Sequence, residues 1–381
     1  MILKNPKDLI SSNRLDIGFK IYYLLNKDDS NEVYSSHLGP ITSFKYIEFD
    51  DPKKNSLEKF VQTFNEVNKS IKCNGFDYSK SSLIPLSKDG SILNGSHRIA
   101  SLIYNKCDKI ECVVMENQKP LNYNYVFFRR LGVKNSYIEK AVLTLLNYTN
   151  KCFVAVIWPT ASDNLDFIEK KLKEIIYVKR VSFNFLGLCN FVSQIYPDEQ
   201  WLGNVENNFK GSKVKAINCY KKNRDTIIIF FNSKKSDHTF LKNNIRDNFK
   251  IGKHSIHICD HANESLNIAK IVLNNGVEVV YNNFDLLSDK NLFVSSSKKY
   301  LIKLPSSLGY IPLNKSELTF DYSVMFNDNL FFGYNSSDKL KINFKSLFLS
   351  QSNILTLKLK VLLNQSIIYK FIKKNIYGFW R

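Results

Sequence analysis

The sequence predicts an α/β protein, and three observations indicate this fold class. Between residues 151 and 285, short apolar runs alternate with amphipathic segments of helical period, which is typical of an open sheet with helices on its faces, and residues 277–281 are expected to be the last strand. Upstream, residues 83–104 have the pattern of a hairpin that leads directly into a helix. Apolar residues make up 44% and aromatic residues 13% of the 381 positions, so a core can form and a wholly disordered chain is excluded.

Length and pattern divide the chain into three regions. We expect an α+β domain at residues 1–120, an open α/β sheet domain at residues 121–285 and a C-terminal extension at residues 286–381. The second region begins with a linker and a helix before its first strand.

Turn residues separate the expected elements of the first region. The Lys88-Asp89-Gly90 turn predicts a hairpin, because Asp-Gly is among the strongest hairpin signals. Apolar residues at helical spacing predict an amphipathic helix at residues 56–70. The remaining elements are a turn-like segment at residues 35–40, a strand at residues 46–49, a helix after residue 98 and a strand at residues 110–115.

The segment between the hairpin and the next helix carries the strongest chemical signal. It contains Asn94, Gly95, Ser96, His97 and Arg98. A helix start offers unpaired N–H groups and the positive end of the helix dipole. Glycine lets an anion approach the backbone, and the arginine fork fits phosphate oxygens. The loop is therefore interpreted as a phosphate cradle. The alternative is an ordinary N-cap followed by a surface helix.

Residues 41–116 resemble the ParB/sulfiredoxin superfamily domain. The resemblance rests on the Lys88-Asp89-Gly90 hairpin, on residues 92–98, which read Ile-Leu-Asn-Gly-Ser-His-Arg, and on the helix after them. Members of this superfamily include CTP-binding partition proteins, ATP-using sulfiredoxins and free-serine kinases. The resemblance implies a nucleotide-binding domain for ATP or CTP with Mg²⁺, in which residues 94–98 contact the phosphates. Kinase-like members carry an acid just before the glycine, where this chain has Asn94.

A phosphotransferase also needs a group that accepts the proton of the attacking hydroxyl. Glu48, near the end of the predicted strand, is the first candidate for this base. His97 is the second catalytic candidate, because an imidazole can donate to a phosphate or move a proton. The alternative for Glu48 is a solvated strand end, with Asp51 or Ser56 capping the next helix.

A second candidate site lies in the sheet region. His254, His257, Asp260 and His261 surround the end of a strand predicted at residues 254–259, where ligands bind in open α/β sheets. Strand residues alternate faces, so His257 shares a face with Cys259 and not with His254. Three interpretations stay open. They are a metal site of His257, Asp260 and His261, a polar active-site loop, and simple capping by Asp260 beside a buried His257.

The C-terminal extension bears a faint resemblance, from residue 254 onward, to nucleotidyltransferase-like domains of bacterial surface-polysaccharide gene clusters. Those domains carry a Gly-Ser turn and a paired Asp-x-Asp for two metals. This chain has Gly309 and Asp321 without the pair, so the resemblance implies a degenerate site.

Residues 355–381 predict a basic amphipathic helix, which either lies on an anionic membrane surface or packs with a solvated lysine face.

The net charge and the cysteine content limit which partners and which cellular compartment we expect. The net charge of +19 comes from 54 Lys and Arg against 35 Asp and Glu, and these residues are spread along the chain. Such a charge suits a nucleic acid or an acidic partner, although an excess of Lys is also typical of an AT-rich genome. The seven scattered cysteines indicate reduced thiols. With no signal peptide and no transmembrane run, we expect a cytoplasmic protein.

Two functional hypotheses follow. The first is a nucleotide-dependent phosphotransferase that acts on a small molecule or a surface-glycan precursor held between the first two regions. The alternative is a non-catalytic nucleotide-binding protein, either a DNA-associated ParB-like switch or a degenerate scaffold. DNA is less favoured, because the pattern after the loop predicts strand–helix alternation and no helix-turn-helix.

Overall fold

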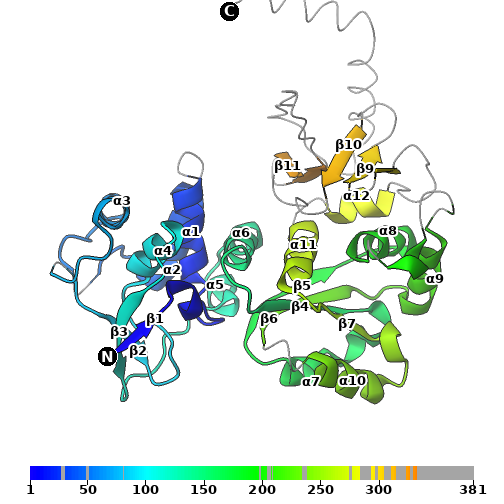
Figure 1. Ribbon diagram of the computed structural model, residues 1–381, viewed down its shortest axis with the longest axis horizontal. Helices are drawn as coiled ribbons and strands as arrows, with labels where there is room; N and C mark the ends of the chain where they lie inside the picture. Colours follow the sequence, from blue (N-terminus) through cyan, green and yellow to red (C-terminus); the bar gives the residue numbers. More distant parts are fainter. Residues whose placement is uncertain are drawn as a thin grey trace, which may run out of the picture.

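The computed structural model describes most of residues 1–283 and five short strands beyond them (Figure 1). The described residues are 1–26, 31–48, 51–79, 81–196, 199–203, 207, 209–233, 238–273, 277–283, 293–296, 299–303, 310–314, 323–326 and 329–332. Helices combine with a mixed sheet and with antiparallel sheets, which confirms the α/β class.

A three-stranded sheet and four helices form the N-terminal unit. The strands are β1 (Ile2–Lys4), β2 (Ile84–Ser87) and β3 (Ile110–Met115), in the order β1-β3-β2. The helices are α1 (Asp16–Leu25), α2 (Asn31–Ile41), α3 (Leu57–Asn74) and α4 (Ser96–Tyr104). Strand β2 is parallel to β3 and β1 is antiparallel to it. The first residues of the chain therefore complete the sheet that carries the hairpin.

Most predicted elements around the loop are confirmed. Helix α3 begins after Ser56, whose hydroxyl accepts a hydrogen bond from the Lys59 amide. The hairpin closes through the Ser87 amide, which donates to the Ser91 carbonyl at 2.9 Å. Gly90, which lies in the turn of this hairpin, has φ +86°, a conformation that favours glycine. Strand β3 follows where the sequence predicts it, whereas helix α4 begins earlier than predicted, at Ser96, so Ser96, His97 and Arg98 form its first turn.

Two predictions in this unit are wrong. Residues 35–40 belong to helix α2 and are not turn-like, and the helix ends at Ile41, one residue after Pro40, whose missing N–H removes one of its last hydrogen bonds. Residues 46–48 of the predicted strand lie outside any strand, and residue 49 lies outside the described residues. The Thr42 hydroxyl accepts from the Tyr46 amide and Tyr46 has φ +52°, so the chain turns here instead of extending.

The second unit contains a four-stranded sheet covered on both faces. Its strands are β4 (Cys152–Ile157), β5 (Ile175–Val181), β6 (Thr226–Asn232) and β7 (Ile256–Ile258), in the order β5-β6-β4-β7. Every adjacent pair is antiparallel. With helix α7 (Leu165–Lys171) and helix α10 (His238–Phe249) as crossovers, this is the order of a split β-α-β motif. The rule that sites lie beyond the carboxyl ends of parallel strands therefore does not apply here.

The remaining helices of this unit cover the other face of the sheet. They are α8 (Phe185–Ile195), α9 (Lys210–Cys219), α11 (Ala262–Val272) and α12 (Val277–Asn283). The sequence predicts a strand at residues 277–281, and this prediction is wrong. As a helix, α12 carries Glu278 and Asn282 four residues apart on one side, where they accept from the amides of Ser182 and Asn184. These tertiary contacts override the strand propensity of its valines.

Alternating residues of the sheet enter two separate cores. Phe153, Ala155 and Ile157 of β4 pack against α7 and α10, whereas Val154 and Val156 join the cluster on the opposite face. This larger cluster is continuous with the core of the N-terminal unit.

Helix α6 (Asn135–Leu146) joins the two units. It contacts α1 on one side and α11 on the other, and it follows the short helix α5 (Tyr125–Arg130) (Figure 1). Gly18 allows α1 to approach closely, because a Cβ there would lie 2.4 Å from the carbonyl oxygen of Ala141.

Beyond residue 283 the structure describes two small antiparallel sheets. One contains β8 (Phe293–Ser296), β9 (Lys299–Lys303) and β10 (Tyr310–Asn314), and the other β11 (Ser323–Phe326) and β12 (Asn329–Phe332). Gly309, Asp321 and the predicted terminal helix at residues 355–381 lie outside the described residues.

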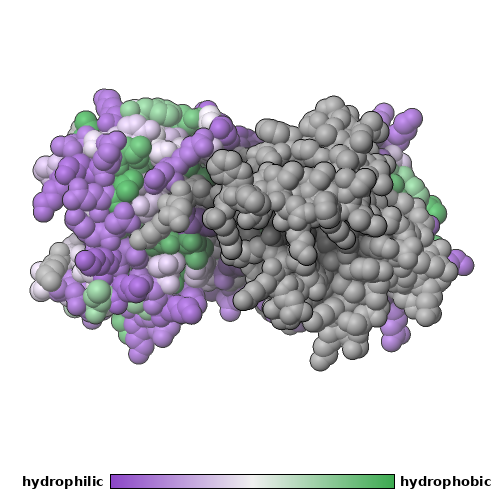
Figure 2. All heavy atoms as spheres, turned by 90° about the horizontal axis from the view of Figure 1, so that it is seen from above, coloured by the Kyte–Doolittle hydropathy of each residue, from purple (hydrophilic) through white to green (hydrophobic). Residues whose placement is uncertain are grey.

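The face of the N-terminal unit seen in Figure 2 is mostly hydrophilic. Seen from above, polar side chains cover most of the N-terminal unit and apolar ones form scattered patches (Figure 2). Among the helices that the structure describes, none has the length and apolar character needed to cross a bilayer. The seven cysteines all lie among the described residues, and none of them is in a disulfide.

Candidate functional site

A cavity of about 820 Å³ opens in the N-terminal unit, and the predicted loop forms one of its walls. Residues 94–98 line it together with residues from α1, from the end of α2 and from α3. Glu48 lines the same cavity. The structure thus brings together all the residues that the sequence predicts for the first site.

A buried ion cluster at the start of α1 also lines this cavity. The Asp16 carboxylate accepts two hydrogen bonds from Arg14, at 2.8 and 2.9 Å, and one from Lys20 at 2.8 Å. All three side chains are at most 2% exposed. The guanidinium of Arg14 also donates to the carbonyl of Ile92, just before the loop. The cluster therefore connects α1 to the hairpin that leads into residues 94–98.

Asp16 is ionised in this cluster. Burial raises the pKa of its carboxyl, but attraction and hydrogen bonds from Arg14 and Lys20 outweigh burial and hold the pKa well below its usual range. Two cations with one carboxylate leave a net positive charge beside the cavity.

Helix α4 begins on the cavity with unpaired amides. Its N-cap is Gly95, which has φ +89° and offers no side-chain cap. Within the described part of the chain, no group accepts a hydrogen bond from the amides of Ser96, His97 and Arg98. By contrast, α3, α5 and α8 each have a Ser or Asn side chain as their N-cap. Three free N–H groups at the positive end of a helix form a favourable position for an anion.

Arg98 folds back over the glycine of the loop. Its guanidinium donates to the Ser82 carbonyl at 2.5 Å, and a Cβ on Gly95 would lie 2.8 Å from its terminal nitrogen. The left-handed φ of Gly95 adds a second reason why only glycine fits here. The arginine is therefore held beside the free amides.

His97 is a neutral imidazole with one nitrogen already engaged. Its Nε2 lies 2.8 Å from the hydroxyl of the buried Tyr34, and its ring packs on Phe64 with ring centroids 4.7 Å apart. Burial lowers the pKa of His97 well below its usual value, and the charges of Lys20 and Lys54 lower it further. The ring is fixed in direction and uncharged at neutral pH.

Glu48 lies close to two other charged groups of the cavity wall. Its carboxylate contacts the ammonium of Lys54 at 2.5 Å, and Asp51 contacts the same ammonium at 3.4 Å. Asp51 does not cap α3, since Ser56 does. The cavity lining carries five cationic and three acidic side chains, so its charge balance favours an anionic ligand.

Sequence reasoning missed Arg14, Asp16 and Lys20. The available signal was a charged pair four residues apart inside the otherwise apolar run of residues 15–25. A lysine and an aspartate on the buried face of such a helix are expected only when they are paired.

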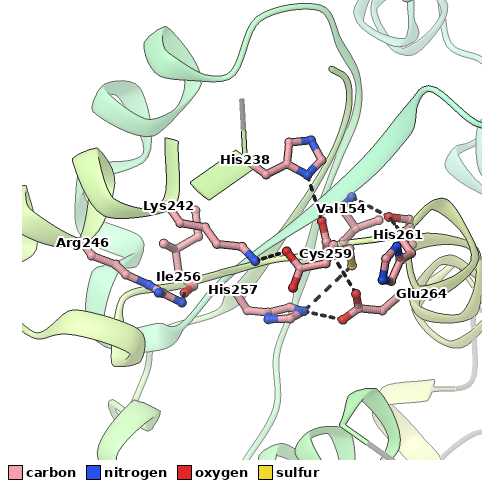
Figure 3. A network of polar contacts seen from close by, with 11 residues as sticks. Val154, His238, Lys242, Arg246, Ile256, His257, Cys259, His261 and Glu264 are labelled. Atoms are coloured by element: carbon pink, nitrogen blue, oxygen red, sulfur yellow. Dashed lines mark hydrogen bonds and ion pairs between the residues drawn. The ribbon is translucent and has the colours of Figure 1, made fainter. Parts of the chain in front are cut away.

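The second predicted group is brought together only in part (Figure 3). His257 is buried on β7 and shares a face with Cys259, as the strand period predicts, with Nε2 and Sγ 3.9 Å apart. His254 lies apart, with its Nδ1 3.7 Å from Sγ of Cys219. Asp260 pairs with Lys242 at 2.6 Å, and His261 is the N-cap residue of α11. Glu264, which the sequence did not single out, is the carboxylate that reaches His257, at 2.8 Å.

We expect Asp16→Asn to destabilise the protein strongly. The substitution leaves Arg14 and Lys20 buried without a counter-charge, which costs about 3–5 kcal/mol in comparable buried pairs. Urea denaturation measures this free energy of unfolding. Asp163→Asn is the control, because Asp163 pairs with Lys221 and Arg224 at the surface, where little change is expected. Equal effects of the two substitutions would contradict the role of the buried cluster.

His97 should make stability depend on pH. In the unfolded chain its pKa is about 6.5, whereas the folded pKa lies well below this value. The unfolded state therefore binds a proton first as the pH falls below about 6.5, and the free energy of unfolding falls by up to about 1.4 kcal/mol per pH unit for this group. Urea denaturation between neutral and mildly acidic pH should show a shallower slope for His97→Gln. An unchanged slope would contradict the neutral, desolvated state of the ring.

Comparison with protein-family models, with curated proteins and with solved structures finds no match for this chain. The resemblance of residues 41–116 to the ParB/sulfiredoxin superfamily accordingly stays a prediction, and the site is described by its geometry alone.

Proposed function

We propose that the N-terminal cavity binds a nucleotide through its phosphates and that the protein transfers a phosphoryl group to a small acceptor. One observation carries the proposal. The three unpaired amides of Ser96, His97 and Arg98 open into a cavity in which cationic side chains outnumber acidic ones. A volume of about 820 Å³ is in the range of small-molecule and cofactor sites.

In this proposal the loop supplies the phosphate contacts. The amides at the start of α4 and the guanidinium of Arg98 would hold phosphate oxygens and stabilise charge on the transferred group. His97, with Nε2 engaged by Tyr34, would offer its Nδ1–H as a further donor. Arg98 would exchange its hydrogen bond to the Ser82 carbonyl for the ligand.

Two acidic side chains of the cavity wall fit the remaining tasks. Glu48 and Asp51 both contact the ammonium of Lys54, so a cation already lies between their oxygens. Carboxylate oxygens are the ligands that Mg²⁺ prefers, and Asp51 would hold this ion. Bound Mg²⁺ would neutralise phosphate charge. Glu48 would accept the proton of the acceptor hydroxyl, while Lys54 moves from Glu48 to the phosphates.

A non-catalytic nucleotide-binding protein is the second candidate. One reason is Asn94, a neutral exposed amide at the position where an acid would assist transfer. The other is the ion pair with Lys54, which engages the carboxylate of Glu48. A DNA-associated role has less support. Nine residues of α6, the helix that follows the loop domain and α5, are buried, so this helix cannot enter a major groove.

Nucleotide binding should depend on Arg98. With ATP, CTP, GTP or UTP and Mg²⁺ at about 100 times the dissociation constant, bound ligand stabilises the fold by about 2.7 kcal/mol, which raises the melting temperature. Arg98→Ala should abolish this rise. The matched control is Arg224→Ala, which removes an arginine that pairs with Asp163 outside the cavity. No rise with any nucleotide, or an equal loss in both variants, would contradict the proposed site.

Glu48→Gln separates transfer from binding. The amide keeps the size of the side chain but cannot accept the proton, so turnover should fall by about 10²–10⁴-fold. The measurement is transfer of labelled γ-phosphate from the nucleotide that stabilises the fold to a pool of small hydroxyl-bearing metabolites. The variant should keep the melting shift of the wild type. Nucleotide binding without transfer by the wild type would favour the non-catalytic alternative.

A further inference from the structure

An edge strand and a helix bring three different metal-ligating side chains together in the second unit, away from the N-terminal cavity. Among the strands that the structure describes, β7 pairs with β4 alone, and Cys259 continues this pairing through its amide, which donates to the Val154 carbonyl at 2.9 Å. His257 and Cys259 therefore point to one face, two residues apart. Glu264, in the first turn of α11, reaches back toward them (Figure 3).

The donor atoms of these three residues converge. The imidazole Nε2, the thiol Sγ and a carboxylate oxygen all lie within 4.8 Å of one another. Nε2 is 3.9 Å from Sγ and 2.8 Å from Oε1 of Glu264. Ligands around one tetrahedral cation with bonds of about 2.0–2.3 Å are separated by comparable distances, so the ion would need only small side-chain shifts.

We propose that His257, Cys259 and Glu264 bind a divalent transition-metal cation of the Zn²⁺ class. A thiolate and an imidazole select a borderline-soft cation, whereas Mg²⁺ and Ca²⁺ prefer sites made of oxygen ligands alone. Three protein ligands leave a coordination position for water. Binding would replace the hydrogen bond between His257 and Glu264, would leave the imidazole proton on Nδ1 so that Nε2 is free to ligate, and would release the thiol proton to solvent.

The surroundings already orient the proposed ligands. Oε2 of Glu264 accepts from the amide of Asp260 at 2.9 Å, which leaves Oε1 directed at the imidazole. Such outer contacts fix ligand direction in metal sites. Of the cations nearby, Lys242 is paired with Asp260 at 2.6 Å, which balances its charge, and Arg246 donates to the Ile256 carbonyl at 3.3 Å.

This site differs from the set that the sequence predicts. Only His257 belongs to both sets, because His254 lies near Cys219 and Asp260 is engaged by Lys242. The proposal is also independent of nucleotide binding, since none of its ligands lines the N-terminal cavity.

Cobalt titration of the full chain tests the proposal. Co²⁺ replaces Zn²⁺ in such sites, and a cysteine thiolate bound to it gives a charge-transfer absorption in the near ultraviolet. In reducing, metal-free buffer, the wild type should develop this band with one equivalent of Co²⁺, and one equivalent of Zn²⁺ should remove it. Cys259→Ser, close in size to the native side chain, should lose the band. His257→Gln and Glu264→Gln should bind Co²⁺ more than about tenfold more weakly.

Cys219→Ser is the matched control. Cys219 is also buried and also lies near a histidine, but its contact with His254 has no carboxylate among the described residues close enough to form a metal cluster. This variant should keep the band at one equivalent, and circular dichroism should show that every variant is folded. A wild type without the band, or a band that survives Cys259→Ser, would overturn the proposal. If Cys259→Ser does not fold, unchanged Co²⁺ affinity in Glu264→Gln would overturn it equally.

Discussion

The candidate site depends on the buried carboxylate of Asp16. Among the described residues it is the only carboxylate in direct ion-pair contact with Arg14 and Lys20, and it neutralises one of two cations that would be costly to bury alone. Arg14 in turn donates to the carbonyl of Ile92, two residues before the loop at residues 94–98. Through this one carboxylate, helix α1 fixes the hairpin, and the hairpin fixes the point where α4 begins. The positive character of the cavity and the position of its free amides thus have a common structural origin.

Local sequence signals predicted the elements around this loop. The Asp89-Gly90 turn, the handover from hairpin to helix after it and the cap at Ser56 are each decided by a few adjacent residues, and all three are present, although α4 begins at Ser96 and not after residue 98. Long-range pairing was not predictable in this way. Nothing in residues 2–4 indicates that they pair with β3, and alternation of strands and helices does not distinguish parallel from antiparallel neighbours. Helix α12 was missed because its contacts with residues 182–184 lie far away in the sequence.

The two sites show the same difference between local signals, which the sequence reveals, and long-range contacts, which it does not. Glu48 and residues 94–98 were predicted and line one cavity, but only residues 94–98 lie next to the hairpin in the sequence. The ion cluster of α1 was missed, since a buried charge in an apolar helix is explained only by its partners. At β7 the strand period correctly put His257 and Cys259 on one face, but the carboxylate came from Glu264 and not from Asp260. A side chain at the start of a helix can reach back to a strand end, and the sequence alone does not show which one does so.

The central claim is that the first-turn amides of α4 hold an anion. The most direct measurement is an NMR titration of the deuterated, ¹⁵N-labelled chain with pyrophosphate, followed at the amide signals of Ser96, His97 and Arg98. A hydrogen bond to a phosphate oxygen should shift these three signals downfield together and saturably. The claim is contradicted if they stay in place at saturating pyrophosphate while the signals of surface lysines move, because the ligand would then bind by charge alone.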